Sequence, residues 1–327
     1  MAQRTTDRPA DPAATYDLVY VAPPKELHGW ILDAICREVD QFVEARTAFV
    51  GLDEPFPSAD VYFYSHYGYF REALLHRPEV HHARNVLFYT HPRELWYSNA
   101  ELKYCLNQSD AIISMCSRFA DHIIDNGVAP ELVQVGLLGA DPAVFQPHRR
   151  GTGSVGFCSS YLPRKNGERL LELVRSMPDQ SFVLCGRNWR EWQRFGELQA
   201  LSNFEYLQID YKDYPAFYNS LDVFVSLSTL EGGPVPLIEA AMSNVVPVCS
   251  DTGHARDIIE HGANGFIFDP AAPIAEVVEL IGRARRLQTD IRQTVEHLTW
   301  ERFSKQVQQT AGLLPADGSH RSKPIAA

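Results

Sequence analysis

The stretch from residue 228 to residue 240 constrains the fold of this chain more than any other. It reads Ser-Thr-Leu-Glu-Gly-Gly-Pro-Val-Pro-Leu-Ile-Glu-Ala, and it follows an apolar run, Asp222 to Ser228, that has the composition of a buried strand. A Gly-Gly-Pro turn with a second proline behind it is typical of a helix start. Strand, turn and helix in this order predict an α/β sheet that presents backbone N–H groups and a positive helix end to an anion.

Two carboxylates flank this turn. Glu231 and Glu239 stand eight residues apart, one on each side of it. A simple phosphate loop does not need them, whereas a ligand with phosphate and sugar parts would use amides for the anion and carboxylates for the hydroxyls. A solvated helix start, where Glu is favoured, is the ordinary alternative. The pattern continues in register to Pro270, which argues against that alternative.

The motif and the segment Val246–Pro270 resemble the Glu-x7-Glu region of the retaining GT-B glycosyltransferases of family four, the glycosyl transferases group 1. The resemblance covers roughly the C-terminal half and is much weaker before residue 84. It implies two Rossmann-like α/β domains that face each other across a cleft. It also implies a metal-independent transferase that moves a sugar from a nucleotide-diphosphate sugar, with retention of anomeric configuration and without a further cofactor.

The resemblance assigns the donor's phosphates to basic residues. Lys165 fits the family's lysine, a movable point charge suited to a diphosphate. Ser159 stands where the family often has an arginine, and Arg164 is expected to compensate because a guanidinium grips phosphate with two N–H groups. Arg187 is a further candidate for binding the phosphates.

The remaining donor contacts follow from the same resemblance. Glu231 is expected to bind donor-sugar hydroxyls, Glu239 the ribose, and Tyr211 to border the base. Pro234 has no N–H, so one backbone hydrogen-bond donor that the family often has is absent here. Three backbone N–H groups are also expected to bind the sugar and phosphate, those of Gly232, Gly233 and Val235.

The first half alternates apolar strands with helical stretches, which predicts a parallel sheet. Ligands of such sheets lie beyond the carboxyl ends of the strands, and His66 and His91 each follow a predicted strand. His91 fits the family's histidine that reaches the donor sugar, so we expect it to act in catalysis with Glu231 and Lys165. The alternative is a buried histidine without a catalytic role.

The domain prediction has four parts. Residues 1–14 and 315–327 are expected to be disordered tails. Residues 15–150 form an N-terminal acceptor domain that is shorter than usual, and the loop expected to be glycine-rich is replaced by residues 23–30, with Lys25, His28 and Gly29 as its candidates for ligand contact. Residues 151–299 form the donor domain, and a last helix at about 300–312 packs back on the first domain, as the resemblance implies.

Composition narrows the remaining possibilities. A net charge of −11 argues against a general nucleic-acid binder. The chain shows no apolar signal region and no run long enough to span a membrane. Its six cysteines form no CxxC pair, which indicates a reducing compartment. These features predict a cytoplasmic protein, with peripheral membrane contact left open, and the acceptor is a glycan, a lipid-linked sugar or a small molecule.

Three other classes stay open at this point. A nucleotide-sugar epimerase shares the architecture and needs no acceptor. A catalytically inactive partner subunit would keep the fold, and Ser159 together with the short first domain leaves room for it. A dinucleotide oxidoreductase is least favoured, because no G-x-G-x-x-G follows the first predicted strand.

Overall fold

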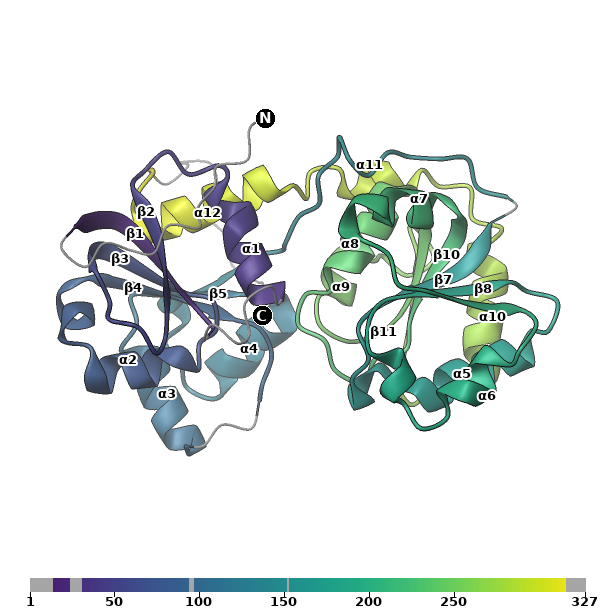
Figure 1. The fold of residues 1–327 in the computed structure, drawn as a ribbon, viewed down its shortest axis with the longest axis horizontal. Helices are drawn as coiled ribbons and strands as arrows, with labels where there is room; N and C mark the ends of the chain where they lie inside the picture. The colour runs from purple at the N-terminus through teal and green to yellow at the C-terminus, as the bar shows by residue number, and fades with distance from the viewer. Residues whose placement is uncertain (1–13, 24–30, 94–96, 152, 316–327) are drawn as a thin grey trace, which may run out of the picture. The chain divides into compact units, whose positions relative to one another are not determined.

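The computed structural model describes residues 14–23, 31–93, 97–151 and 153–315 (Figure 1). They form two α/β units, each built on a six-stranded parallel sheet. The first unit comprises the described parts of Met1–Ser114, Ala120–Gly136 and Glu301–Ala327, and the second comprises those of Met115–Phe119 and Leu137–Trp300. The predicted tails, apart from residues 14 and 315, and the loop candidates Lys25, His28 and Gly29 lie outside the described residues.

The first sheet has the order β2-β1-β3-β4-β5-β6. Its edge strand β2 was not predicted, because a five-residue strand that pairs only with β1 leaves little periodicity in the sequence. The strands of this sheet are β1 Thr15–Ala22, β2 Thr47–Gly51, β3 Ser58–Tyr64, β4 Arg84–Tyr89, β5 Ala111–Ser114 and β6 Val133–Val135.

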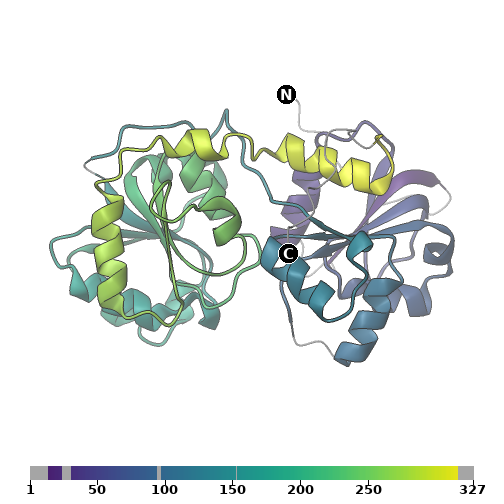
Figure 2. The same cartoon turned by 180° about the vertical axis from the view of Figure 1, so that it is seen from behind.

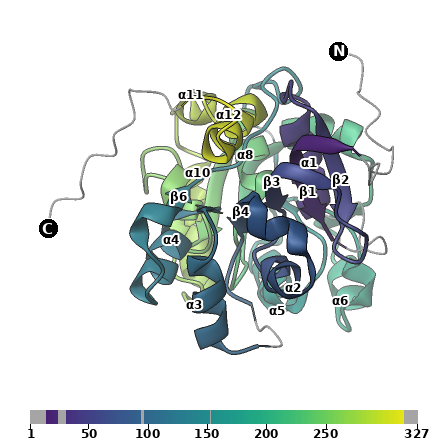
Figure 3. The same ribbon diagram turned by 90° about the vertical axis from the view of Figure 1, so that its left-hand side faces the viewer.

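Helices cover both faces of this sheet, with α1 and α12 on one side and α2 and α3 on the other (Figure 3). Their bounds are α1 Ile31–Asp40, α2 Tyr69–His76, α3 Asn99–Asn107, α4 Ser117–Asp125 and α12 Trp300–Ala311. The last helix, α12, is yellow in Figure 2. The ring of Phe303 packs 5.8 Å from that of Phe88, and Ser304 Oγ donates to the Val39 carbonyl at 2.8 Å. The first unit is thus completed by a segment from the far end of the chain.

The second sheet has the order β12-β11-β10-β7-β8-β9. Its strands are β7 Ser154–Cys158, β8 Phe182–Cys185, β9 Phe204–Leu207, β10 Leu221–Ser226, β11 Val246–Ser250 and β12 Phe266–Phe268. Helices α5, α6 and α10 lie on one side of it, and α7, α8 and α11 on the other (Figure 1). The helices are α5 Gly167–Ser176, α6 Phe195–Gln199, α7 Tyr214–Asn219, α8 Val235–Met242, α9 Ala255–Ile258, α10 Ile274–Ala284 and α11 Ile291–Val295.

The strand order decides where a ligand can bind. In each unit the chain leaves one central strand in one direction and later returns to build the sheet in the other, which makes a topological switch point. In the first unit the switch lies between β1 and β3, and in the second it lies between β7 and β10. Loops at the carboxyl ends of these strand pairs diverge to opposite faces and leave room between them.

None of the helices within the described ranges has the length and apolar character needed to cross a bilayer.

Candidate functional site

The loops after β7 and β10 meet at the switch point of the second unit. The loop after β7 ends in a short 3₁₀ turn, Pro163–Lys165, closed by Asn166 in the left-handed conformation at φ 60°. Thr229, in the loop after β10, donates its N–H to the Arg164 carbonyl at 2.9 Å. This bond joins the two loops and brings the predicted phosphate cations beside the first predicted carboxylate.

Glu231 lies between these cations. The Lys165 ammonium pairs with Glu231 Oε1, and Arg164 Nη1 lies 3.2 Å from Oε2. Arg164 Nη1 also donates to the Leu230 carbonyl at 2.8 Å. Burial by itself raises the pKa of Glu231, but the charges of Lys165 and Arg164 outweigh burial and hold that pKa below its ordinary value. The two predicted phosphate cations and the predicted sugar-binding carboxylate thus form one charged cluster with one net positive charge.

This cluster predicts an acid-dependent contribution to stability. The pKa of Glu231 is lower in the folded chain than the value of about 4.3 expected for unfolded glutamate. Its stabilising contribution is therefore complete above that value and is lost as the pH falls through the folded pKa. We expect the free energy of unfolding of Glu231→Gln, measured by urea titration between pH 3 and 6, to fall less steeply with acid than that of the wild type. The same slope in both proteins would contradict the assignment, and Glu276→Gln on the exposed face of α10 is the control.

The glycine turn presents free amides next to this cluster. Gly232, Gly233 and Val235 donate no backbone hydrogen bond to any part of the chain that the structure describes. Helix α8 begins at Val235, directly after Pro234, so its positive end adds to the field at the turn. Amides without an internal partner at a helix start are suited to bind an anion.

Glu239 lies one helical turn further into α8 and is almost completely buried. Its carboxylate accepts hydrogen bonds from two tyrosines, with Tyr211 Oη at 2.6 Å and Tyr218 Oη at 2.7 Å. Tyr211 is half exposed, whereas Tyr218 is fully buried. The structure therefore joins two predicted residues, Glu239 and Tyr211, and adds Tyr218, which the sequence analysis missed because a tyrosine in a short helix gives no sign of its partner.

Arg187 is not among the partners of Glu231 in the part of the chain that the structure describes. It follows β8 at the same edge of the sheet, its side chain is exposed, and its carbonyl accepts from the Tyr161 N–H at 2.8 Å. Ser159 directly follows β7 and donates its backbone N–H to the Cys185 carbonyl at 3.0 Å. Arg187 thus stays a candidate phosphate contact by its position at the carboxyl edge.

The first unit carries a polar group at the ends of β3 and β4. His91 is buried, its carbonyl accepts from Tyr67 Oη at 3.0 Å, and Arg93 Nε lies 3.4 Å from His91 Nε2. His66 accepts the Gly68 N–H at Nδ1, at 3.0 Å. Burial, followed by the charges of Arg93 and His91, lowers the pKa of His66 to about 3. His66 is therefore a neutral side chain at physiological pH.

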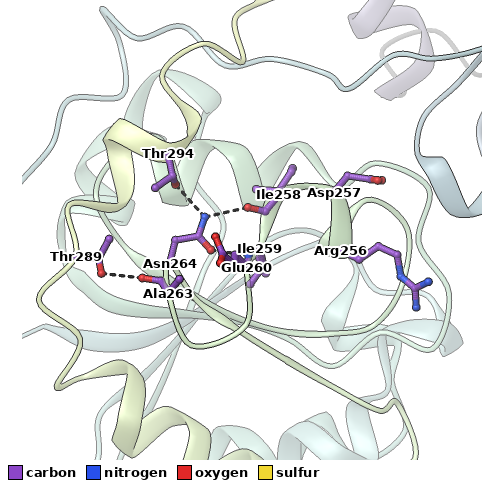
Figure 4. A pocket seen from close by; sticks show the side chains of 9 residues that line it. All are labelled: Arg256, Asp257, Ile258, Ile259, Glu260, Ala263, Asn264, Thr289 and Thr294. Carbon is purple, nitrogen blue, oxygen red and sulfur yellow. Dashed lines mark hydrogen bonds between the residues drawn. The ribbon is translucent and has the colours of Figure 1, made fainter. Parts of the chain in front are cut away.

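A separate hollow of about 490 Å³ lies beside α9 (Figure 4). Its polar groups bond among themselves: Asn264 Nδ2 donates to the Ile258 carbonyl and to Thr294 Oγ1, each at 3.0 Å, and Thr289 Oγ1 donates to the Ala263 carbonyl at 2.7 Å. None of the predicted site residues lines this hollow, and it carries no part of the candidate site.

The comparison with family models agrees with the geometry of the second unit. Residues 146–296 match the model described as "Glycosyl transferases group 1". This part of the chain is similar to the group 1 glycosyl transferases. The segment of this chain that matches the family model contains Lys165, Glu231 and Glu239. No curated protein sequence matches the chain.

Solved glycosyltransferase structures resemble almost the whole chain. HepE of Anabaena in complex with UDP-glucose aligns with a TM-score of 0.74 at 14% identity, over 91% of this chain and 100% of that one. A glycosyltransferase of Rickettsia africae aligns with a TM-score of 0.71 at 12% identity, over 92% and 100%. The lipopolysaccharide outer core galactosyltransferase WaaB in its apo form aligns at 0.70 and 14%, over 91% and 99%. This likeness establishes the fold as GT-B, with two Rossmann-like domains.

Proposed function

We propose that this protein is a group 1 glycosyl transferase, a retaining and metal-independent enzyme that moves a sugar from a nucleotide-diphosphate sugar to an acceptor hydroxyl. The observation that carries the proposal is the cluster of Lys165, Arg164 and Glu231 beside the free amides of the glycine turn. A site with excess positive charge and unpaired N–H groups suits a diphosphate. A carboxylate in the same site suits sugar hydroxyls.

The basic residues would act on the leaving group. As the bond between the sugar carbon and the phosphate oxygen breaks, negative charge builds up on the diphosphate. Lys165 and Arg164 neutralise this charge, and Arg187 is a further contact. The backbone N–H groups of the glycine turn bind the same anion. Because these groups are already in place in the folded unit, they need little reorganisation during the reaction.

The carboxylates would hold the hydroxyl groups of the donor. Glu231 binds the transferred sugar, and its pairing with Lys165 keeps it ionised as an acceptor of hydrogen bonds. Glu239 accepts from the ribose, with Tyr211 bordering the base. His91, in the first unit, contacts the donor sugar. UDP is the first nucleotide to test, because it is the ligand named for HepE.

Retention follows from attack on the face that the leaving group departs from. The acceptor oxygen bonds to the sugar carbon on that face, the carbon–phosphate-oxygen bond breaks, and the departing phosphate takes the acceptor's proton. Cationic side chains do the charge neutralisation that a metal ion supplies in other transferases. The acceptor, whether a glycan, a lipid-linked sugar or a small molecule, is expected to bind in the first unit.

We expect transfer to continue in EDTA and the product to keep the donor's anomeric configuration. A panel of UDP-sugars and acceptors is incubated with the protein, products are detected by mass, and the anomeric proton signal is read by NMR. An inverted product, or activity only with Mg²⁺ or Mn²⁺, would contradict the mechanism. Isomerisation of the nucleotide sugar without acceptor would instead indicate an epimerase, and binding without turnover across the panel an inactive partner.

A further inference from the structure

His254 is a buried histidine whose side chain has no assigned role. It follows β11 in the loop before α9, and its ring is completely buried. The Pro234 carbonyl lies near the ring, but neither Nδ1 nor Nε2 makes a hydrogen bond of ordinary geometry in the described part of the chain. A neutral imidazole carries one N–H donor and one acceptor nitrogen, and burying both without partners is unfavourable. Such a group calls for a partner that the surrounding described residues do not provide in good geometry.

The ring lies against the glycine turn of the candidate site. A Cβ atom on Gly233 would lie 3.3 Å from His254 Nδ1. The backbone N–H of His254 donates to the Gly232 carbonyl at 3.0 Å. Gly253, at φ +52°, lies so close that a Cβ there would be 2.2 Å from the Gly232 carbonyl oxygen. The loop after β11 and the loop after β10 therefore pack backbone against backbone, with the ring in contact with the turn.

The ring is neutral under ordinary conditions. Burial lowers the pKa of His254 to about 4, while the Pro234 carbonyl and the Glu231 carboxylate work in the opposite direction. The ring therefore has one N–H to donate at neutral pH. A bound anion is the natural acceptor, because the turn that touches the ring is the one whose own amides are unpaired.

We propose that His254 belongs to the donor site and donates a ring N–H to the diphosphate that binds at the Gly232-Gly233 turn. The inference rests on the proposed function for the identity of the anion. Both ring nitrogens are covered by surrounding atoms, so contact with the anion requires a small shift of the turn. Two consecutive glycines make the backbone there easy to move. The bound diphosphate then gives the ring N–H a charged acceptor.

The test compares two replacements of His254 by isothermal titration with UDP. His254→Gln keeps a side-chain N–H donor, and His254→Leu fills the space without one. We expect the dissociation constant of the leucine variant to rise about 10- to 100-fold, the range for a lost hydrogen bond to a charged group, and that of the glutamine variant to rise much less. His76→Leu, on the exposed surface of α2, should bind as the wild type does. Circular dichroism of each unliganded variant verifies folding.

Each result decides the question. Wild-type affinity for UDP in the leucine variant overturns the proposal. An equal loss of affinity in both variants also overturns it, because it would show that the ring supports the turn by packing and not by donating a hydrogen bond. If the leucine variant fails to fold, the wild type provides the test. On addition of UDP the chemical shift of the His254 ring N–H proton should move downfield in NMR, and an unchanged chemical shift overturns the proposal. Inorganic phosphate in place of UDP shows whether the anion alone suffices. If UDP and other nucleoside diphosphates do not bind the wild type, the proposed function fails instead.

Discussion

Replacing Lys165 with alanine is expected to lower turnover by about 100-fold or more, while the affinity for the nucleotide sugar falls much less. The ammonium of Lys165 is in place at the switch point, paired with Glu231 and largely buried. Its charge is needed most when the diphosphate departs, so its loss raises the barrier more than it weakens ground-state binding. Steady-state and single-turnover rates with a radiolabelled donor separate the two effects.

The control for this variant follows from the ion pair. Without Lys165, Glu231 keeps Arg164, 3.2 Å away, and a hydrogen bond from Ser228, and an incompletely paired buried carboxylate destabilises the fold. The double variant Lys165→Met with Glu231→Gln removes both charges and separates the cost in stability from the cost in rate. Lys212→Ala changes an exposed lysine and should alter neither. An unchanged rate in Lys165→Ala would move the role to Arg164 or Arg187.

Replacing Glu239 with glutamine is expected to abolish the rise in melting temperature that UDP causes in the wild type. A ligand at about 100 times its dissociation constant stabilises a protein by about 2.7 kcal/mol, which differential scanning measures easily. The carboxylate of Glu239 is the proposed acceptor for the ribose. An amide has one acceptor oxygen where the carboxylate has two, so it cannot serve the ribose and both tyrosines alike.

Glutamine is preferred to alanine because of the two tyrosines. Alanine would leave the hydroxyls of Tyr211 and Tyr218 without their carboxylate and would open a cavity. Glu276→Gln, on the exposed face of α10, is the matched control: it makes the same chemical change outside the candidate site and should leave the UDP shift in place. A full UDP shift in Glu239→Gln would show that the ribose binds elsewhere.

Local patterns were enough to predict much of the second unit. The run before residue 228 and the turn after it carry strand and helix signals within a few residues, and they became β10 and α8. The predicted strand near residue 154 and the helix that follows it became β7 and α5. These elements could be predicted because side-chain periodicity and turn residues act over short distances along the chain.

The first unit contains elements that local sequence patterns do not predict. Its edge strand β2 is too short to show a period, and its helix α12 joins the unit from more than 150 residues beyond β6. Only the resemblance to a family, and no local pattern, predicted that this last helix packs back. The bond from Arg84 Nε to the Thr310 carbonyl, at 3.0 Å, spans 226 residues of sequence.

By itself, the sequence identified the candidate residues for a nucleotide-sugar site: a lysine in one loop, and two glutamates around a glycine turn in another. The tertiary structure decided how they combine. Lys165 and Glu231 are 66 residues apart and meet because β7 and β10 are neighbours at the switch point. His254 meets the turn because β11 lies on the other side of β10. Strand order depends on long-range packing of buried faces, which no short stretch of sequence contains, and it is that order which turns separate polar residues into one charged site.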